Sequence, residues 1–260
     1  TVQKIDTSHD STTEDYKEFT VNVIPNIDEN RRRLLIYLLG TGVFATVPGC
    51  ASGPRIQRLM PMPEEMPEDK SIFQIMGEVT VNGMAASLET RVNPGDVLET
   101  DEKGETVFVF GKDAFLLRAN SRMQMPGAQT PSRGYALERG KALSVFASRA
   151  TEIRTPTAVI AIRGTGVYVE SEPELSYVCT CYGTTDIAAA DDPTVTRTVV
   201  AQHHDEPVYV LADRNRANRI APAPFKNHDD QELLLIETLV GRSTPYVVPK
   251  GIKRTRGRYL

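Results

Sequence analysis

Short runs of alternating hydrophobic and polar residues fill the chain from Ile72 to Ala190. Turn residues (Gly, Asn, Asp and Pro) separate these runs at intervals of roughly 10 to 15 residues, which is typical of successive β-strands. The dipeptide Asn82-Gly83 between two runs is a strong signal for a tight hairpin turn. No part of this range has the repeat of an amphipathic helix. The pattern predicts a mainly β domain of short antiparallel strands, either a sandwich or solenoid-like, over residues 71–190.

A different pattern follows in residues 191–245. The stretch TRTVVAQHHDEPVYVLAD predicts a further strand pair. Leucine, isoleucine and valine residues then recur at near-helical spacing in NHDDQELLLIETLVGR. Asn227 or Asp229 suits the N-cap of a helix there, and Gly241 suits its end. We expect one short C-terminal amphipathic helix, packed on the β domain.

The most apolar segment lies near the N-terminus and predicts an export signal. Three arginines, residues 31–33, precede an uncharged run from Leu34 to Val47. As a helix this run would be about 21 Å long, well short of the ~30 Å core of a bilayer. A basic region, a short apolar region and small residues in that order are typical of a secretory signal. An uncleaved membrane anchor and a buried core helix are the alternatives.

The end of this segment, VPGC, resembles a bacterial lipobox, in which the cysteine becomes the lipid-modified first residue of the mature protein. The resemblance implies lipidation at Cys50. Ala51 follows, and by the rule of that family this favours an outer-membrane destination. RRRLL also resembles a twin-arginine motif, so residues 31–50 are assigned to a lipoprotein or twin-arginine-like signal. We expect a periplasmic protein that a lipid anchors to the outer membrane, with inner-membrane anchoring as the alternative.

The remaining segments carry weaker patterns. Residues 1–30 are polar and acidic, which predicts a disordered leader or an upstream start that the working protein lacks. Residues 51–70 are rich in proline and methionine and predict a tether. Residues 246–260 form a basic tail. The net charge of −4 gives no indication of nucleic-acid binding.

The β region resembles the FecR domain, a periplasmic module of the family named after the iron-dicitrate transport regulator. The resemblance runs from about Ile75 to Ile187 and rests on several motifs in order: GEVTVNG, VNPGDVLETDEKGETVFVFG, LLRANSRMQM, LERGKALSV and IRTPTAVIAIRGTGVYVE. The last is the most specific, because family members carry a Thr-Pro…Arg-Gly-Thr signature there. The signature residues of this chain are Thr155, Pro156, Arg163, Gly164 and Thr165.

We interpret this signature as a scaffold. Gly164 and Gly166 flank Thr165, where glycine allows the close approach or positive φ of a strand bulge. Arg163 is expected to bond loop carbonyls or a carboxylate. FecR itself signals across the inner membrane to a sigma factor through a cytoplasmic helical domain, and no such helical pattern precedes the apolar run here.

Two of the three cysteines, Cys179 and Cys181, are one residue apart. In a regular strand both side chains point to the same face, with Cα atoms about 6.6 Å apart. A disulfide between them would need a kinked backbone. Two thiolates can bind one metal ion by side-chain rotation alone. A strained disulfide and a pair of reduced core thiols are the alternatives to a metal site.

Histidines that could complete a metal site lie downstream. The neighbours His203 and His204 would point to opposite faces of a regular strand, so at most one can join the cysteines. Asp205 could orient an imidazole from outside the site. This donor set suits zinc or copper. The predicted ligands are Cys179, Cys181, His228 and one of His203 and His204.

The sequence contains no H-E-x-x-H, G-x-S-x-G or phosphate-loop motif. A strand thiol is also a poor nucleophile, because nucleophilic cysteines need exposure and an activating base. We therefore expect a non-catalytic protein that acts in binding or assembly at the cell envelope, with an envelope protein or a glycan as partner. The alternative is a single-pass inner-membrane signal sensor related to FecR.

Overall fold

The computed structural model describes residues 63–129, 133–147 and 150–246. The expected leader, the signal segment with Cys50, residues 51–62 of the tether and residues 247–260 of the basic tail lie outside these ranges. Within them, no helix is both long enough and apolar enough to cross a membrane.

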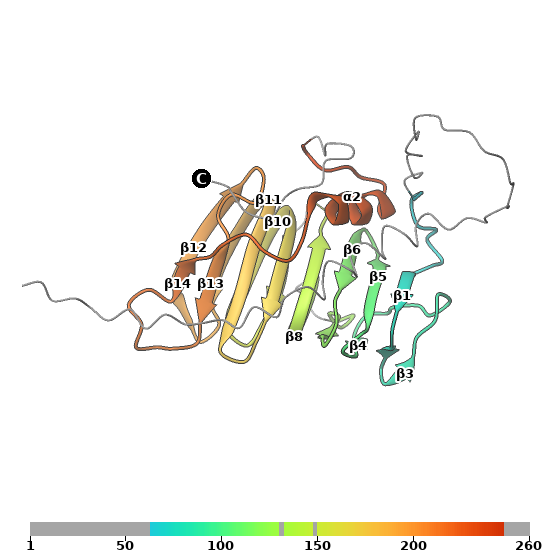
Figure 1. Ribbon diagram of the computed structural model, residues 1–260, viewed down its shortest axis with the longest axis horizontal. Coiled ribbons are helices and arrows are strands. Elements are labelled where there is room, and N and C mark those ends of the chain that lie inside the picture. The colour runs from blue at the N-terminus through green and yellow to red at the C-terminus, as the bar shows by residue number, and fades with distance from the viewer. Residues whose placement is uncertain (1–62, 130–132, 148–149, 247–260) are drawn as a thin grey trace, which may run out of the picture. The chain divides into compact units, whose positions relative to one another are not determined.

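The described part is mainly β, as predicted, and its strands form one sheet that is not closed (Figure 1). The strands are β1 (Ile72–Met76), β2 (Val79–Val81), β3 (Met84–Ala85), β4 (Val97–Thr100), β5 (Glu105–Phe110), β6 (Asp113–Leu117), β7 (Arg122–Gln124), β8 (Arg133–Val145), β9 (Ala150–Arg154), β10 (Ala158–Ser171), β11 (Leu175–Ala189), β12 (Asp192–Ala201), β13 (Val208–Leu211) and β14 (Ile220–Pro222). Asn82 and Gly83 both have positive φ between β2 and β3, which confirms the predicted tight turn.

Most neighbouring strands are antiparallel, as expected, but β8 and β9 pair in parallel. The strands β8 and β9 run in the same direction because both are antiparallel to β10. Its N-terminal half pairs with β9 and its C-terminal half with β8. The alternating sequence pattern predicted the strands. It did not predict that β8 and β9, which are adjacent in the chain, would both pair with β10 and with each other.

The central strands are buried on both faces. In β5, Phe108 belongs to the larger apolar cluster, whereas Val107 and Val109 belong to a second cluster on the opposite face. The same alternation places Val178 of β11 in the first cluster and Tyr177 in the second. Both apolar faces of these strands are therefore covered, which needs a further element over the second face.

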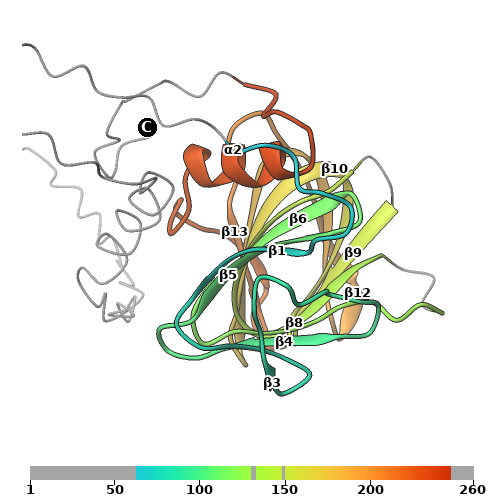
Figure 2. The ribbon, with the colours of Figure 1, turned by 90° about the vertical axis from the view of Figure 1, so that its right-hand side faces the viewer.

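That element is the helix α2 (Asp230–Leu239), which lies over β6 and β8 (Figure 2). Asp229 is its N-cap, and it forms a capping box with Glu232. Gly241 follows the helix with a φ of +67°, which suits a glycine. Leu233, Ile236 and Leu239 enter the second apolar cluster. The predicted amphipathic helix, its N-cap and its end are thus confirmed.

The signature segment lies at an irregular part of β10. Gly164 has a φ of +59°, and the register between β10 and β11 shifts between Arg163 and Val167. Arg163 pairs with the Asp186 carboxylate at 3.1 Å. Thr155 closes the turn between β9 and β10, in which Pro156 lies, because its hydroxyl accepts a hydrogen bond from the Ala158 N–H. Thr155, Pro156 and Gly164 thus lie where the backbone turns or bends, whereas Arg163 forms an exposed ion pair.

The folded domain begins before the expected boundary at residue 71. The Met66 N–H donates to the Leu239 carbonyl at 2.9 Å, and the Met66 side chain packs against the second apolar cluster. At Met66 the expected tether is therefore packed against the end of α2. Proline and methionine enrichment alone did not separate a tether from a packed extended segment.

Candidate metal centre

The pattern of pairing along β11 creates a gap in the sheet. One edge of β11 pairs with β10 along its length, while its other edge pairs with β13 over Leu175–Val178 and with β12 over Gly183–Ala189. The residues between these two ranges, from Cys179 to Tyr182, have no strand on that edge. The connection between β12 and β13 fills the gap instead, and the His204 N–H donates to the Cys181 carbonyl at 2.9 Å.

Four side chains converge at this gap. The donor atoms of Cys179, Cys181, His204 and His228 all lie within 4.8 Å of one another, and all four residues are buried. The Cys179 Sγ is 3.5 Å from Nδ1 of His204, and the Cys181 Sγ is 3.4 Å from Nε2 of His228. The sequence predicted this group with either His203 or His204 as a member, and the structure places His204 in it.

The geometry at Cys181 depends on a bulge. Thr180 pairs with Val167 and Tyr182 pairs with Gly166, so Cys181 is the extra residue of β11. Gly166 leaves room for this arrangement, because a Cβ atom there would lie 2.6 Å from Cε1 of Tyr182. Both thiols lie on the face covered by α2.

The outer nitrogen of each imidazole has its own hydrogen-bond acceptor. Nδ1 of His228 donates to the Lys226 carbonyl at 2.8 Å, and Nε2 of His204 donates to the Asp230 carboxylate at 3.1 Å. These bonds fix the protonated nitrogen of each neutral ring on the outside. The inner nitrogens, Nε2 of His228 and Nδ1 of His204, therefore present lone pairs to the centre of the group.

The two inner nitrogens lie 3.1 Å apart. Two lone pairs at this distance repel each other, so the arrangement needs either a proton on one nitrogen or a cation bound to both. A metal-ligating histidine usually donates its other N–H to a carboxylate or a backbone carbonyl. His204 and His228 show both kinds of partner.

The interatomic distances also suit a tetrahedral ion. Bond lengths of about 2.05 Å to nitrogen and 2.3 Å to sulfur place tetrahedral N–N pairs about 3.3 Å apart and N–S pairs about 3.6 Å apart. The observed values are 3.1 Å for the nitrogens, 3.4 Å from Cys181 to His228 and 3.5 Å from Cys179 to His204. Small side-chain rotations would bring the four donors to such an ion.

The two thiols cannot readily ionise together without a cation. Burial raises the pKa of Cys181, and the adjacent Cys179 sulfur raises it further. Burial also acts to raise the pKa of Cys179, but its contacts with Cys181, His228 and His204 outweigh burial and lower it. One negative charge is thus favoured on the pair, and a second needs compensation by a positive ion.

In the metal-free group, protonation of His204 is the other way to balance this charge. Burial alone would lower the pKa of His204, but the Asp230 carboxylate and the Cys179 sulfur outweigh it and raise that pKa. In the absence of an ion, a proton shared between His204 and the thiolate is therefore the alternative to a bound cation.

His203 lies outside the group, and the reason differs from the expected strand alternation. Gln202 to Pro207 form a turn in which His204 has a φ of +56°, so the two rings lie only 4.9 Å apart. Nε2 of His203 bonds to the Asp230 carboxylate at 2.8 Å. Asp205 does not orient an imidazole as expected. Its carboxylate accepts the backbone N–H groups of Gln202 and His203.

Asp230 is the functional residue that the sequence analysis missed. A single oxygen, Oδ1, accepts hydrogen bonds from both His203 and His204. An acidic residue in the first turn of a helix is usually explained by the helix dipole. Asp229 and Asp230 follow His228 directly, and nothing in this sequence indicates that Asp230 would bond to His204, 26 residues earlier in the chain.

The disulfide that was one alternative to a metal site does not form, since Cys179 and Cys181 are both free. Aromatic rings enclose the group. The Tyr168 ring stacks on His228 at 4.4 Å between centroids, and the Phe225 ring contacts both histidines. Such a shell limits solvent access and strengthens electrostatic interactions inside it.

A buried ion-pair network lies beside this shell. Arg118 bonds to Glu232 at 2.8 Å, to Glu105 at 3.2 Å and to the Asn227 carbonyl at 2.9 Å. Because Asn227 precedes His228 and Glu232 lies in α2, this network fixes the start of the helix and with it the position of the His228 ring.

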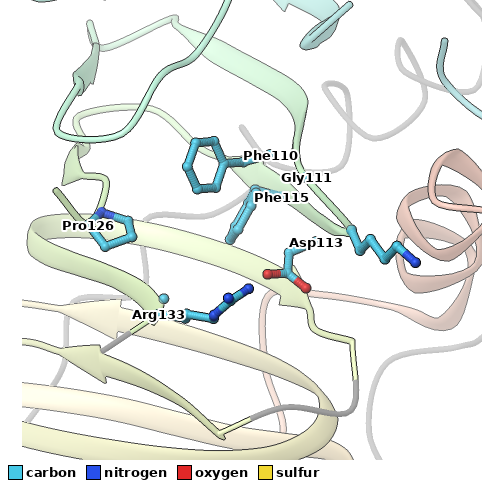
Figure 3. A pocket seen from close by; sticks show the side chains of 8 residues that line it. Phe110, Gly111, Asp113, Phe115, Pro126 and Arg133 are labelled. Carbon is cyan, nitrogen blue, oxygen red and sulfur yellow. The ribbon is translucent and has the colours of Figure 1, made fainter. Parts of the chain in front are cut away.

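A separate hollow of about 260 Å³ lies on another part of the domain (Figure 3). Phe110, Phe115, Pro126 and Arg133 are among the residues that line it. None of its lining residues belongs to the Cys/His group, and the Asp113 carboxylate there already accepts the Ala147 N–H at 2.8 Å. This hollow has no converging set of polar groups comparable to the Cys/His group.

Comparisons with known proteins leave the chain without a family. No protein-family model matches it, and no curated protein matches it. Two crystal structures of a candidate anti-sigma factor from Parabacteroides distasonis, at 2.50 and 1.65 Å resolution, resemble it over 53% of this chain with 18% identity and a TM-score of 0.41. The matched region spans 62% of that protein, less than two thirds of its length. A likeness at this level does not assign a function to this chain.

Proposed function

We propose that this domain is a non-catalytic metal-binding module of the cell envelope, in which Cys179, Cys181, His204 and His228 hold one Zn²⁺ ion. The observation that supports the metal site most directly is the 3.1 Å distance between Nδ1 of His204 and Nε2 of His228. The other nitrogen of each ring donates its N–H to an acceptor outside the group, so these two nitrogens face each other with lone pairs. A tetrahedral ion would satisfy both lone pairs and both sulfurs at once.

The four donors would make a closed site. Two thiolates and two imidazoles complete a tetrahedron, so no position is left for a substrate or an activated water molecule. Zinc or copper(I) fits this soft donor set, and zinc fits it without redox chemistry. The ion would fasten the β12–β13 connection and the segment before α2 onto β11, so that the metal supports a binding or assembly surface.

The test of the metal site is the metal content of the purified full-length chain, measured by elemental analysis after dialysis. We expect one zinc per chain, and thiolate-to-metal charge transfer when cobalt replaces zinc. Cys181→Ser and His228→Ala should lose the ion. His203→Ala is the matched control, because its ring lies next to the group but outside it. A wild-type chain that binds neither zinc nor copper would contradict the proposal.

The envelope location rests on the lipobox-like VPGC and is tested separately. Palmitate labelling in a bacterial host should be present in the wild type and lost in Cys50→Ala. Labelling that persists in Cys50→Ala would contradict lipidation at this residue. A chain that retains residues 31–50 and stays in the inner membrane would instead support the sensor alternative, without changing the expectation for the metal site.

A further inference from the structure

The donors of the proposed site are too deeply buried to meet an ion directly. Cys179 and Cys181 are fully buried, His228 is 2% exposed and His204 is 8% exposed. An incoming hydrated ion therefore needs a first ligand nearer the surface and a movement of the side chains that cover the thiols.

His203 has the properties of such a first ligand. Its side chain is 30% exposed, and its Nε2 lies 2.8 Å from Oδ1 of Asp230. The same oxygen lies 3.1 Å from Nε2 of His204, whose side chain is 4% exposed. One carboxylate oxygen thus contacts the exposed imidazole and the buried imidazole at the same time.

The donor atoms of His203, His204 and Asp230 also lie within 4.8 Å of one another. Imidazole nitrogen and carboxylate oxygen are both common zinc ligands. The left-handed conformation of His204 brings the two rings together, which a regular strand would have kept on opposite faces. The turn therefore creates a second donor set that shares one residue with the buried group.

We infer that His203 and Asp230 form a surface capture site for a divalent ion on its way to the buried Cys/His group. This inference rests on the proposed function. An ion bound by the Asp230 carboxylate and by Nε2 of His203, in its Nδ1–H tautomer, displaces the N–H donors that Oδ1 accepts. His204 then loses the hydrogen bond that holds its ring in place, and rotation of this ring opens a path to the thiols.

A capture site speeds the entry and the exit of the ion equally, because both follow the same path. Loading should be measured by mixing the metal-free full-length chain with Zn²⁺ and a chromophoric chelator, and release by adding excess chelator to the loaded chain. We expect His203→Ala to slow both rates by about tenfold or more, with the dissociation constant and the stoichiometry unchanged.

Two further variants make the test specific. His203→Gln retains an N–H donor for Asp230 but is a poor zinc ligand, so it should be as slow as His203→Ala. Gln202→Ala, at an exposed neighbouring position, should load at the wild-type rate. If His203→Ala or His203→Gln loads at the wild-type rate, or if either variant releases the ion faster, the capture site is wrong. A wild-type chain without metal would instead contradict the buried site itself.

Discussion

Nε2 of His228 lies 3.1 Å from Nδ1 of His204, and both rings donate their other N–H group outside the pair. His204 belongs to the connection between β12 and β13, whereas His228 precedes α2. The contact therefore joins two segments that the bonds of His203 and His204 to Asp230 also hold together. A metal ion between them would link both segments to the thiols of β11.

Removal of the ion should loosen these two segments in particular. We expect a chelator to increase backbone hydrogen exchange in residues 202–207 and 223–239. The strands β4 and β7 should keep their protection, because each pairs with a strand on both edges and α2 packs mainly on β6 and β8. Hydrogen exchange with mass spectrometry would measure this. An equal increase across the sheet would show that the ion supports the whole fold instead.

Metal affinity should rise with pH near neutrality. The raised pKa of Cys181 means that this thiol keeps its proton in the metal-free domain at neutral pH and must lose it to bind the ion. At least one proton is therefore released per ion, and the association constant should rise at least about tenfold per pH unit between pH 7 and 8. Calorimetry in buffers of different ionisation enthalpy would count the protons. An affinity that is constant over this range would contradict the assignment of Cys181 as a ligand.

Loss of Arg118 should destabilise the domain strongly. Arg118→Met leaves Glu105 and Glu232 buried without their common cation, which typically costs about 3–5 kcal/mol in the free energy of unfolding. Arg163→Met is the matched control, because its pair with Asp186 is exposed and should contribute little. Urea unfolding of both variants would compare them, and similar midpoints would refute the structural role of Arg118.

Gly183 should tolerate no side chain. It has a φ of +89°, and a Cβ atom there would lie 2.5 Å from Oγ1 of Thr165 and 2.9 Å from the Gly164 carbonyl oxygen. Gly183→Ala adds this clash to a backbone strain of about 1–2 kcal/mol. Gly83→Ala has a similar φ of +76° with nothing within 4 Å, so it reports the strain alone. Thermal unfolding should show a larger decrease in the melting temperature for Gly183→Ala than for Gly83→Ala. Equal decreases would show that the clash does not contribute to the destabilisation.

The sequence was most informative where the cause is local. Hydrophobic alternation located the strands. The Asn82-Gly83 dipeptide predicted a turn because both residue types tolerate the positive φ that they adopt there. Asp229 was a predicted N-cap, and it forms a capping box with Glu232 at the start of the helix. The Cys/His group was predicted in outline because residues two apart on β11 share a face. The lipidation of Cys50 and the FecR resemblance stay predictions.

The non-local features could not be read from patterns. Nothing in the runs indicates that β12 and β13 would each pair with β11 instead of with each other. Because of that pairing, His203 and His204 lie in the connection between the two strands. His204 has a positive φ there, so the two side chains do not alternate as they would in a strand. The role of Asp230 follows only from this arrangement, because its partners come from a segment that is distant in the chain.

The gap on the edge of β11 separates two tasks that a β-domain usually assigns to the same residues. The hydrogen-bonded ladders on either side preserve the architecture, while the short connection from Gln202 to Pro207 supplies His204, one of the four members of the Cys/His group. Changes in the length or sequence of this connection would therefore alter the proposed site, while the ladders of β11 with β12 and β13 would be inherited intact.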